Sequence, residues 1–360
     1  MLGKRSRKNK IIMQKHTIKI KNLENSMIEI EASITVEELE KRKEKAVKNL
    51  SSEIKMDGFR KGHIPEDVLI KKIGEMPLLN EMANLALSDI YPIIIIQNNI
   101  KAIGQPQITI TKIAPKNPVD FKITVAIMPE FKLPDYKKIA KKINSEKEEL
   151  VEVTEKDVED TITQIQKMNT PQPTPTKDEN GIDKAVVPEL PEVNDEFVKK
   201  LGDFKDVADF KIKLKENIKK EKEHKASEIK KVKIIDSVLE ETKIELPEII
   251  IQSELERMLA QTKADITRMG LQFDKYLEHI KKTIEEFKIE LKPEAIKRAK
   301  IQLILDSIIK EEKIVPNEDE VKKNVEELLK QHKEAKEEQV KPYVEMVLSN
   351  QEVFKLLESF

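Results

Sequence analysis

Apolar residues in the first part of the chain follow two different periods. Over residues 18–34, and again over 108–127, they fall on every second position, which is typical of strands that bury one face. Over residues 36–90 they recur three and four positions apart, which predicts amphipathic helices. Two strands, then helices, then two more strands predict an antiparallel sheet with helices on one face, an α+β domain.

The first predicted helix begins with a capping sequence. In Thr35-Val36-Glu37-Glu38 the threonine hydroxyl can accept a hydrogen bond from the third amide of the helix, while Glu38 reaches back to the amide of Thr35. The apolar spacing that follows, as far as Ile54, predicts one helix. A second, short helix is expected to follow Pro65 and to end at Gly74.

Helical spacing also dominates residues 190–360, which predicts an all-α region whose stretch 301–309 is apolar on nearly every side. Residues 170–189 are rich in proline and polar residues, so we expect an extended or disordered connector there. The predicted organisation is a basic tail at 1–14, an α+β domain at 15–143, a connector at 144–189 and an elongated α-helical domain at 190–360.

Composition narrows the possible functions. Charged residues make up 37% of the 360 residues and aromatic residues only 4%, which fits long solvated helices better than a large β core. The net charge is −1, so any attraction to RNA must be local. The chain has no cysteine, which excludes disulfides, thiol catalysis and thiolate metal sites, and suits a reducing compartment.

Targeting segments are not evident in the sequence. The basic tail is followed only by Ile11-Ile12-Met13, which is too short for the apolar core of a secretory signal. The run Ile93 to Ile96 is too short to span a bilayer. We therefore expect a soluble, cytoplasmic protein with no membrane partner.

A short exposed loop is expected between the first helical segments, with the sequence Asp57-Gly58-Phe59-Arg60-Lys61-Gly62-His63-Ile64-Pro65. The two glycines permit the positive φ angles that a tight loop needs, and proline favours the first turn of the next helix. A phenylalanine between cations on such a loop suggests a partner. The alternative is that Phe59 folds back onto its own helices and the cations are only solvated.

The pattern G-F-R-K-G-x-x-P resembles the ribosome-docking signature of the trigger factor family of bacterial nascent-chain chaperones. The order of strands and helices, and the closing segment Pro129 to Pro134, resemble the amino-terminal domain of that family. Later phrases resemble its chaperone domain: Leu190-Pro191-Glu192, Leu246-Pro247-Glu248 and the stretch from Ala299 to Val315.

The resemblance implies ATP-independent holding of nascent chains at the ribosomal tunnel exit, with help to folding and export. The implied partners are a ribosomal protein, rRNA and unfolded polypeptides, with a possible homodimer off the ribosome. Since the family usually begins close to its first strand, Met13 rather than Met1 is a second candidate for the start. The implied ribosome-binding residues are Gly58, Phe59, Arg60, Lys61, Gly62 and Pro65.

The chain departs from the family between the helix near Val158 and the phrase at Leu190. Family members usually carry a prolyl isomerase domain there, whereas this chain has only the polar connector. We therefore predict no enzyme activity and no catalytic residue, although the family is labelled a peptidyl-prolyl cis-trans isomerase. The alternatives are an isomerase with an unrecognised site, and a helical scaffold or RNA-binding protein without clients.

Other chemistry has little support in the sequence. A glycine-rich phosphate loop and a nucleophile motif are both missing, so neither ATP use nor a cofactor is expected. His63 stands where the family often has lysine, so part of the docking charge could depend on pH, or the residue is simply solvated. The histidines are dispersed, which argues against a metal site: His16, His63, His224, His279 and His332.

Methionine is the residue of adaptable apolar surfaces as well as of cores. Three methionines of the helical half, Met258, Met269 and Met346, are therefore candidate client-binding residues, with core packing as the alternative.

Overall fold

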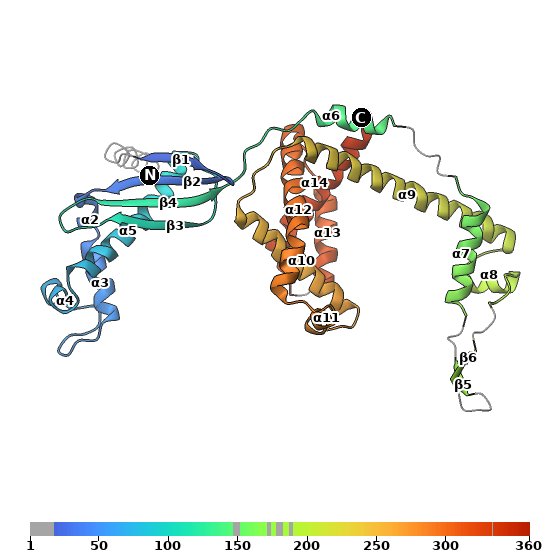
Figure 1. Ribbon diagram of the computed structural model, residues 1–360, viewed down its shortest axis with the longest axis horizontal. Coiled ribbons are helices and arrows are strands. Elements are labelled where there is room, and N and C mark those ends of the chain that lie inside the picture. Colours follow the sequence, from blue (N-terminus) through green and yellow to red (C-terminus); the bar gives the residue numbers. More distant parts are fainter. Residues whose placement is uncertain (1–17, 147–151, 171–173, 178–182, 187–189, 333) are drawn as a thin grey trace. The chain divides into compact units, whose positions relative to one another are not determined.

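The computed structural model describes residues 18–146, 152–170, 174–177, 183–186, 190–332 and 334–360 (Figure 1). The predicted basic tail and most of the connector lie outside these residues. Contacts divide the described chain into two compact units. The first takes the described residues up to Lys132 together with Thr242–Ile304, and the second takes Leu133–Glu241 and Leu305–Phe360.

The first unit contains a four-stranded antiparallel sheet in the order β1-β2-β4-β3. Ile30 of β2 pairs with Ile20 of β1 and with Ile123 of β4, so the alternating apolar positions of the strands share one face. The predicted alternation is confirmed. The strands are β1 (Lys19–Leu23), β2 (Met27–Ile34), β3 (Ala102–Lys112) and β4 (Val119–Ile127).

Helices cover the apolar face of the sheet, as the α+β prediction requires (Figure 1). Ile28, Ile30 and Phe121 of the sheet lie in the same core as Leu79, Met82 and Ala86 of the longest of these helices. The helices are α2 (Val36–Glu40), α3 (Lys43–Glu53), α4 (Glu66–Ile73) and α5 (Glu75–Gln97). The short second helix ends at Gly74, with φ of 87°, as predicted.

The prediction of one helix after Thr35 is wrong, because the chain turns at Lys41 and Arg42, between α2 and α3. The amide of Arg42 donates to the carbonyl of Leu39, at 2.9 Å, which tightens the chain at that point. Half of the predicted cap forms, since the Thr35 hydroxyl accepts from the amide of Glu38 at 3.4 Å. The Glu38 carboxylate accepts hydrogen bonds from Lys41 and Arg42 instead.

Helix α5 is the one helix among the described residues that is long and apolar enough to cross a membrane. Leu78, Met82 and Ile90 are buried in the core that this helix forms with the sheet. Its apolar composition is therefore accounted for by the packing of this domain.

The rest of the described chain is almost entirely helical, as predicted. Small apolar cores hold neighbouring helices together, one formed by Ile162, Val198 and Phe210, and another by Val321, Val325 and Val344. The helices are α6 (Tyr136–Asn144), α7 (Glu155–Met168), α8 (Asp195–Leu201), α9 (Val207–Glu241), α10 (Glu248–Arg268), α11 (Phe273–His279), α12 (Ile284–Glu312), α13 (Glu318–Gln331) and α14 (Glu337–Ser359).

The predicted connector contains more order than its composition suggests. Strands β5 (Thr174–Lys177) and β6 (Asp183–Val186) pair antiparallel, with Thr174 opposite Val186. Backbone pairing of this kind does not need an apolar core, which is why apolar periodicity did not predict it.

In the second unit, α6 is tied to the ends of α12 and α14. The Tyr136 hydroxyl donates to the Glu312 carboxylate, which also pairs with Lys137 at 2.7 Å. The amide of the Asn144 side chain donates to the carbonyl of Leu357 at 2.8 Å. These contacts fix the helix that immediately follows the α+β region.

Candidate functional site

The loop predicted from the sequence joins α3 to α4, at the end of this helical pair that points away from the sheet (Figure 1). Gly58 has φ of 84° and Gly62 has φ of 79°, so both take the left-handed conformation that the sequence predicts. A Cβ at Gly58 would meet nothing within 4 Å. Glycine is therefore needed at position 58 for its backbone conformation and not for space.

Backbone hydrogen bonds hold the loop in one shape. The amide of Phe59 donates to the carbonyl of Met56, and that of His63 donates to the carbonyl of Arg60. The amide of Gly62 reaches back to the carbonyl of Ser51 on α3, at 3.0 Å. A loop fixed in this way loses little conformational entropy when it binds a partner.

One side chain of the loop is buried, and the others are exposed. Ile64 is buried at the end of the loop, whereas Phe59 is 40% exposed. Arg60 and Lys61 are exposed, and neither forms an ion pair within the described part of the chain. The site thus offers a partly exposed aromatic ring beside two unneutralised cations.

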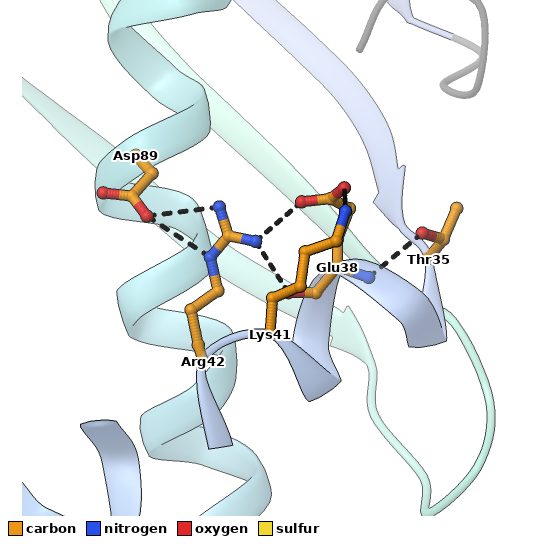
Figure 2. A network of polar contacts seen from close by, with 5 residues as sticks. All are labelled: Thr35, Glu38, Lys41, Arg42 and Asp89. Atoms are coloured by element: carbon orange, nitrogen blue, oxygen red, sulfur yellow. Dashed lines mark hydrogen bonds and ion pairs between the residues drawn. The ribbon is translucent and has the colours of Figure 1, made fainter. Parts of the chain in front are cut away.

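A network of charges fixes the start of α3 to α5 (Figure 2). Arg42 Nη1 donates to the carbonyl and to the carboxylate of Glu38, at 2.7 and 2.6 Å. Its Nε and Nη2 donate to Asp89 of α5, at 3.3 and 3.2 Å. Burial alone would raise the pKa of Glu38, but the hydrogen bonds from Lys41 and Arg42 outweigh it and hold the pKa below its usual value.

Two further contacts brace the helices that carry the loop. Asn49 Nδ2 of α3 donates to Glu81 of α5 at 2.7 Å, and Lys43 of α3 pairs with Glu66 of α4 at 2.7 Å. The hydrogen bond to Glu66 raises the pKa of Lys43. Local spacing in the sequence carries no sign of the Asn49–Glu81 and Lys43–Glu66 contacts, because each joins residues of two different helices.

The three candidate client-binding methionines have different surroundings. Met258 is only 7% exposed, so its side chain is packed in α10, whereas Met269 is 76% exposed just after that helix. Met346 of α14 is half-buried. The structure does not bring the three together as one group of exposed side chains.

Exposed apolar side chains are nevertheless common on the helices. They lie on α9, after α10, on α12, after α12 and on α14: Ile212, Ile229, Val232, Met269, Leu271, Ile289, Val315 and Tyr343. Tyr343 also lines a groove of about 460 Å³ between α13 and α14, beside Leu328 and Val347. Sequence spacing assigned most of these positions to helices but could not tell which of them stay uncovered.

The described part of the chain contains no group of His, Asp and Glu side chains placed to hold a metal ion. Several aromatic residues of the helical segments pack in small cores, for example Phe273 against Phe287, with ring centres 6.1 Å apart.

Comparison with known proteins relates the chain to one family over most of its length. A family model described as "Bacterial trigger factor protein (TF)" matches residues 16–165, and one described as "Bacterial trigger factor protein (TF) C-terminus" matches residues 206–357. Neither model covers the segment between them. Among its described residues this segment holds the end of α7, the β5–β6 hairpin and α8, and no domain of isomerase type.

Individual relatives agree with the family models. The trigger factor of Clostridium botulinum (strain Hall) is 26% identical, over 94% of this chain and 98% of the relative. That of Agathobacter rectalis is 23% identical over 87% of each chain, and that of Clostridium tetani is 22% identical over 88% and 90%.

A solved structure has the same fold. It comes from work titled "Promiscuous Substrate Recognition in Folding and Assembly Activities of the Trigger Factor Chaperone", and it matches with a TM-score of 0.56 and 18% identity, over 95% of this chain and 99% of that one. Because models for the two ends of one family match in order on either side of a short segment, this chain belongs to the trigger factor family of bacterial chaperones.

Proposed function

We propose that this chaperone docks on the ribosome through the loop from Gly58 to Pro65 and holds nascent polypeptides as they leave the tunnel, without ATP. The observation that carries the proposal is the exposed Phe59 beside the unpaired Arg60 and Lys61, on a loop that hydrogen bonds keep in one shape. The proposed setting is the bacterial cytoplasm, where the protein would assist folding and export.

Each part of the loop would have its own role at the ribosome. Phe59 would enter an apolar depression on a ribosomal protein, because burying the rest of its ring removes apolar surface from water. Arg60 and Lys61 would contact rRNA phosphates or acidic side chains. Binding that releases counterions from phosphates weakens as salt rises, so the interaction should depend strongly on ionic strength.

Holding of clients is proposed for the exposed apolar positions of the helical segments. Scattered over several helices, they would make many weak and adaptable contacts with an unfolded chain, and none requires nucleotide. Docking would place these positions beside the emerging polypeptide, at an effective concentration that can reach about the millimolar range. Weak contacts would then be enough to delay aggregation.

The docking proposal is tested by co-sedimentation with ribosomes. The triple variant Phe59→Ala, Arg60→Ala, Lys61→Ala should no longer sediment with ribosomes at physiological salt, while its circular dichroism spectrum stays that of the unaltered protein. A matched control removes one exposed aromatic ring and two lysines elsewhere: Tyr343→Ala, Lys336→Ala, Lys341→Ala. If the loop variant sediments as well as the control, the loop is not the anchor.

A further inference from the structure

The outer side of α3 carries lysines that lead towards the docking loop. Lys45 and Lys48 lie three residues apart, and Ser52 follows four residues later, so the three positions share one side of the helix. All three are exposed, and so is Lys55 at the start of the loop that carries Arg60 and Lys61. We name Lys45, Lys48 and Lys55 the lysine track.

The lysine track differs in its pairing from the three cations at the start of α3. At the start of α3, Lys41 and Arg42 pair with Glu38, and Lys43 pairs with Glu66. No residue of the lysine track forms an ion pair within the described part of the chain, although Glu44 lies four residues before Lys48.

Some exposed lysines of α9, by contrast, have an acidic partner one helical turn away. On α9, Lys213 pairs with Asp209 at 3.1 Å, and Lys225 pairs with Glu221 at 2.7 Å, both at four-residue spacing. The lysine track and the cations of the docking loop therefore form no ion pair with a described residue, while Lys41, Arg42 and Lys43 at the start of α3 each have an acidic partner. Over residues 44–61 five exposed cations stand against three exposed carboxylates, Glu44, Glu53 and Asp57, which leaves a local excess of positive charge on a chain whose net charge is −1.

We propose that the lysine track binds the phosphate backbone of ribosomal RNA beside the docking loop, an inference that rests on the proposed docking. From Lys45 to the end of α3 the helix rises about 12 Å, at about 1.5 Å per residue. One nucleic-acid strand carries about three or four phosphates over such a length. Lysine ammonium groups on flexible stems can follow this spacing without specific base contacts.

The test is the salt dependence of ribosome binding by the full chain. Each cation that neutralises a phosphate contributes about 0.7 to 0.9 to the slope of log K against log salt concentration. The variant Lys45→Gln, Lys48→Gln, Lys55→Gln should therefore show a slope shallower by about 2 to 3, yet still bind at low salt through the loop. The variant Ser52→Lys should steepen the slope by about 1, because it adds a cation to the same face.

A matched control removes three exposed lysines from the same domain, on and beside β3: Lys101→Gln, Lys112→Gln, Lys116→Gln. It has the same change in net charge, and its slope should equal that of the unaltered protein. An unchanged slope in the lysine-track variant, or the same change in the control, overturns the inference.

Two results separate this inference from the docking proposal and from other partners. If the Phe59 triple variant loses binding but the lysine-track variant keeps its full salt slope, docking stands and the inference fails. A photo-cross-linking residue at position 52 should give ribosome adducts that ribonuclease releases. Adducts with ribosomal protein alone would mean that this face meets an acidic protein surface and not RNA, which overturns the inference.

Discussion

Replacing Arg42 with methionine is expected to loosen the start of α3 much more than replacing Asp89 with asparagine. Arg42 is the one residue that joins both carboxylates of the network, Glu38 of α2 and Asp89 of α5 (Figure 2). Methionine keeps much of the length of the arginine stem, so the substitution removes mainly the guanidinium. The question is which half of the network stabilises the helices that carry the docking loop.

How far each side chain is buried decides how much stability each substitution should remove. The side chains of Arg42 and Glu38 are 16% and 14% exposed, whereas that of Asp89 is 61% exposed. Hydrogen bonds to charged groups contribute about 1.5 to 3 kcal/mol, so losing those between Arg42 and Glu38 should cost about 2 kcal/mol. The exposed contact with Asp89 is worth at most about 1 kcal/mol.

Hydrogen exchange of the α3 amides in the full chain measures these losses of stability locally. A single unfolding transition would not, because the chain has several parts that can unfold separately. For Arg42→Met, amides of α3 that exchange by local opening should exchange about thirtyfold faster, since a factor of ten corresponds to about 1.4 kcal/mol. Asp89→Asn should give less than about a fivefold change. Lys45→Met, the same kind of substitution on the exposed side of α3, is the control and should leave the rates unchanged.

The pKa of Glu38 supplies a second check with a defined sign. Because this pKa is lower in the folded protein, the ionised carboxylate contributes stability above its ordinary value of about 4.3, and the contribution is lost as the pH falls through the folded value. The difference between the unaltered protein and Arg42→Met should therefore shrink in acid. Equal effects of Arg42→Met and Asp89→Asn at neutral pH would refute the reasoning from burial.

Three further predictions concern other parts of the molecule. The full chain should suppress aggregation of a chemically unfolded client, followed by light scattering, equally with and without ATP; no suppression at several-fold excess would favour a scaffold without clients. It should not accelerate cis–trans isomerisation of a short X–Pro peptide in a protease-coupled assay, because only a dry aromatic pocket is expected to lower the rotation barrier of about 20 kcal/mol. Catalysis that scales with protein concentration would reveal a missed site. Hydrogen bonds from Lys222 and Thr154 lower the pKa of Asp157 to about 2, so the link between α7 and α9 should hold above the ordinary aspartate pKa and be lost as the pH falls through about 2; exchange in α7 should become faster in Asp157→Asn at neutral pH, and an unchanged rate would contradict this.

Local sequence patterns predicted those features that depend on one element at a time. The four strands followed from alternation, and the exposed loop from its two glycines. In each case the pattern that predicts the element lies within a few residues along the chain. The family resemblance then supplied the expected use of the loop.

Features that depend on partners far along the chain could not be predicted. The turn at Arg42 interrupts a good helical pattern, and its side chain bonds a carboxylate 47 residues away. The exposure of Met269 and the burial of Met258 depend on which helices cover them, although both positions fit helical spacing. The β5–β6 pair forms through backbone contacts in a segment with few apolar residues.

The central claim is that the loop between α3 and α4 anchors this chaperone on the ribosome, and a ribosome titration tests it most directly. The dissociation constant of the fluorescently labelled full chain should rise by about a hundredfold or more in the Phe59→Ala, Arg60→Ala, Lys61→Ala variant, since a buried interface aromatic alone contributes about 2 kcal/mol and two cations are lost with it. The Tyr343 control variant should bind like the unaltered protein. A loop variant whose dissociation constant stays close to that of the control at physiological salt would contradict the claim.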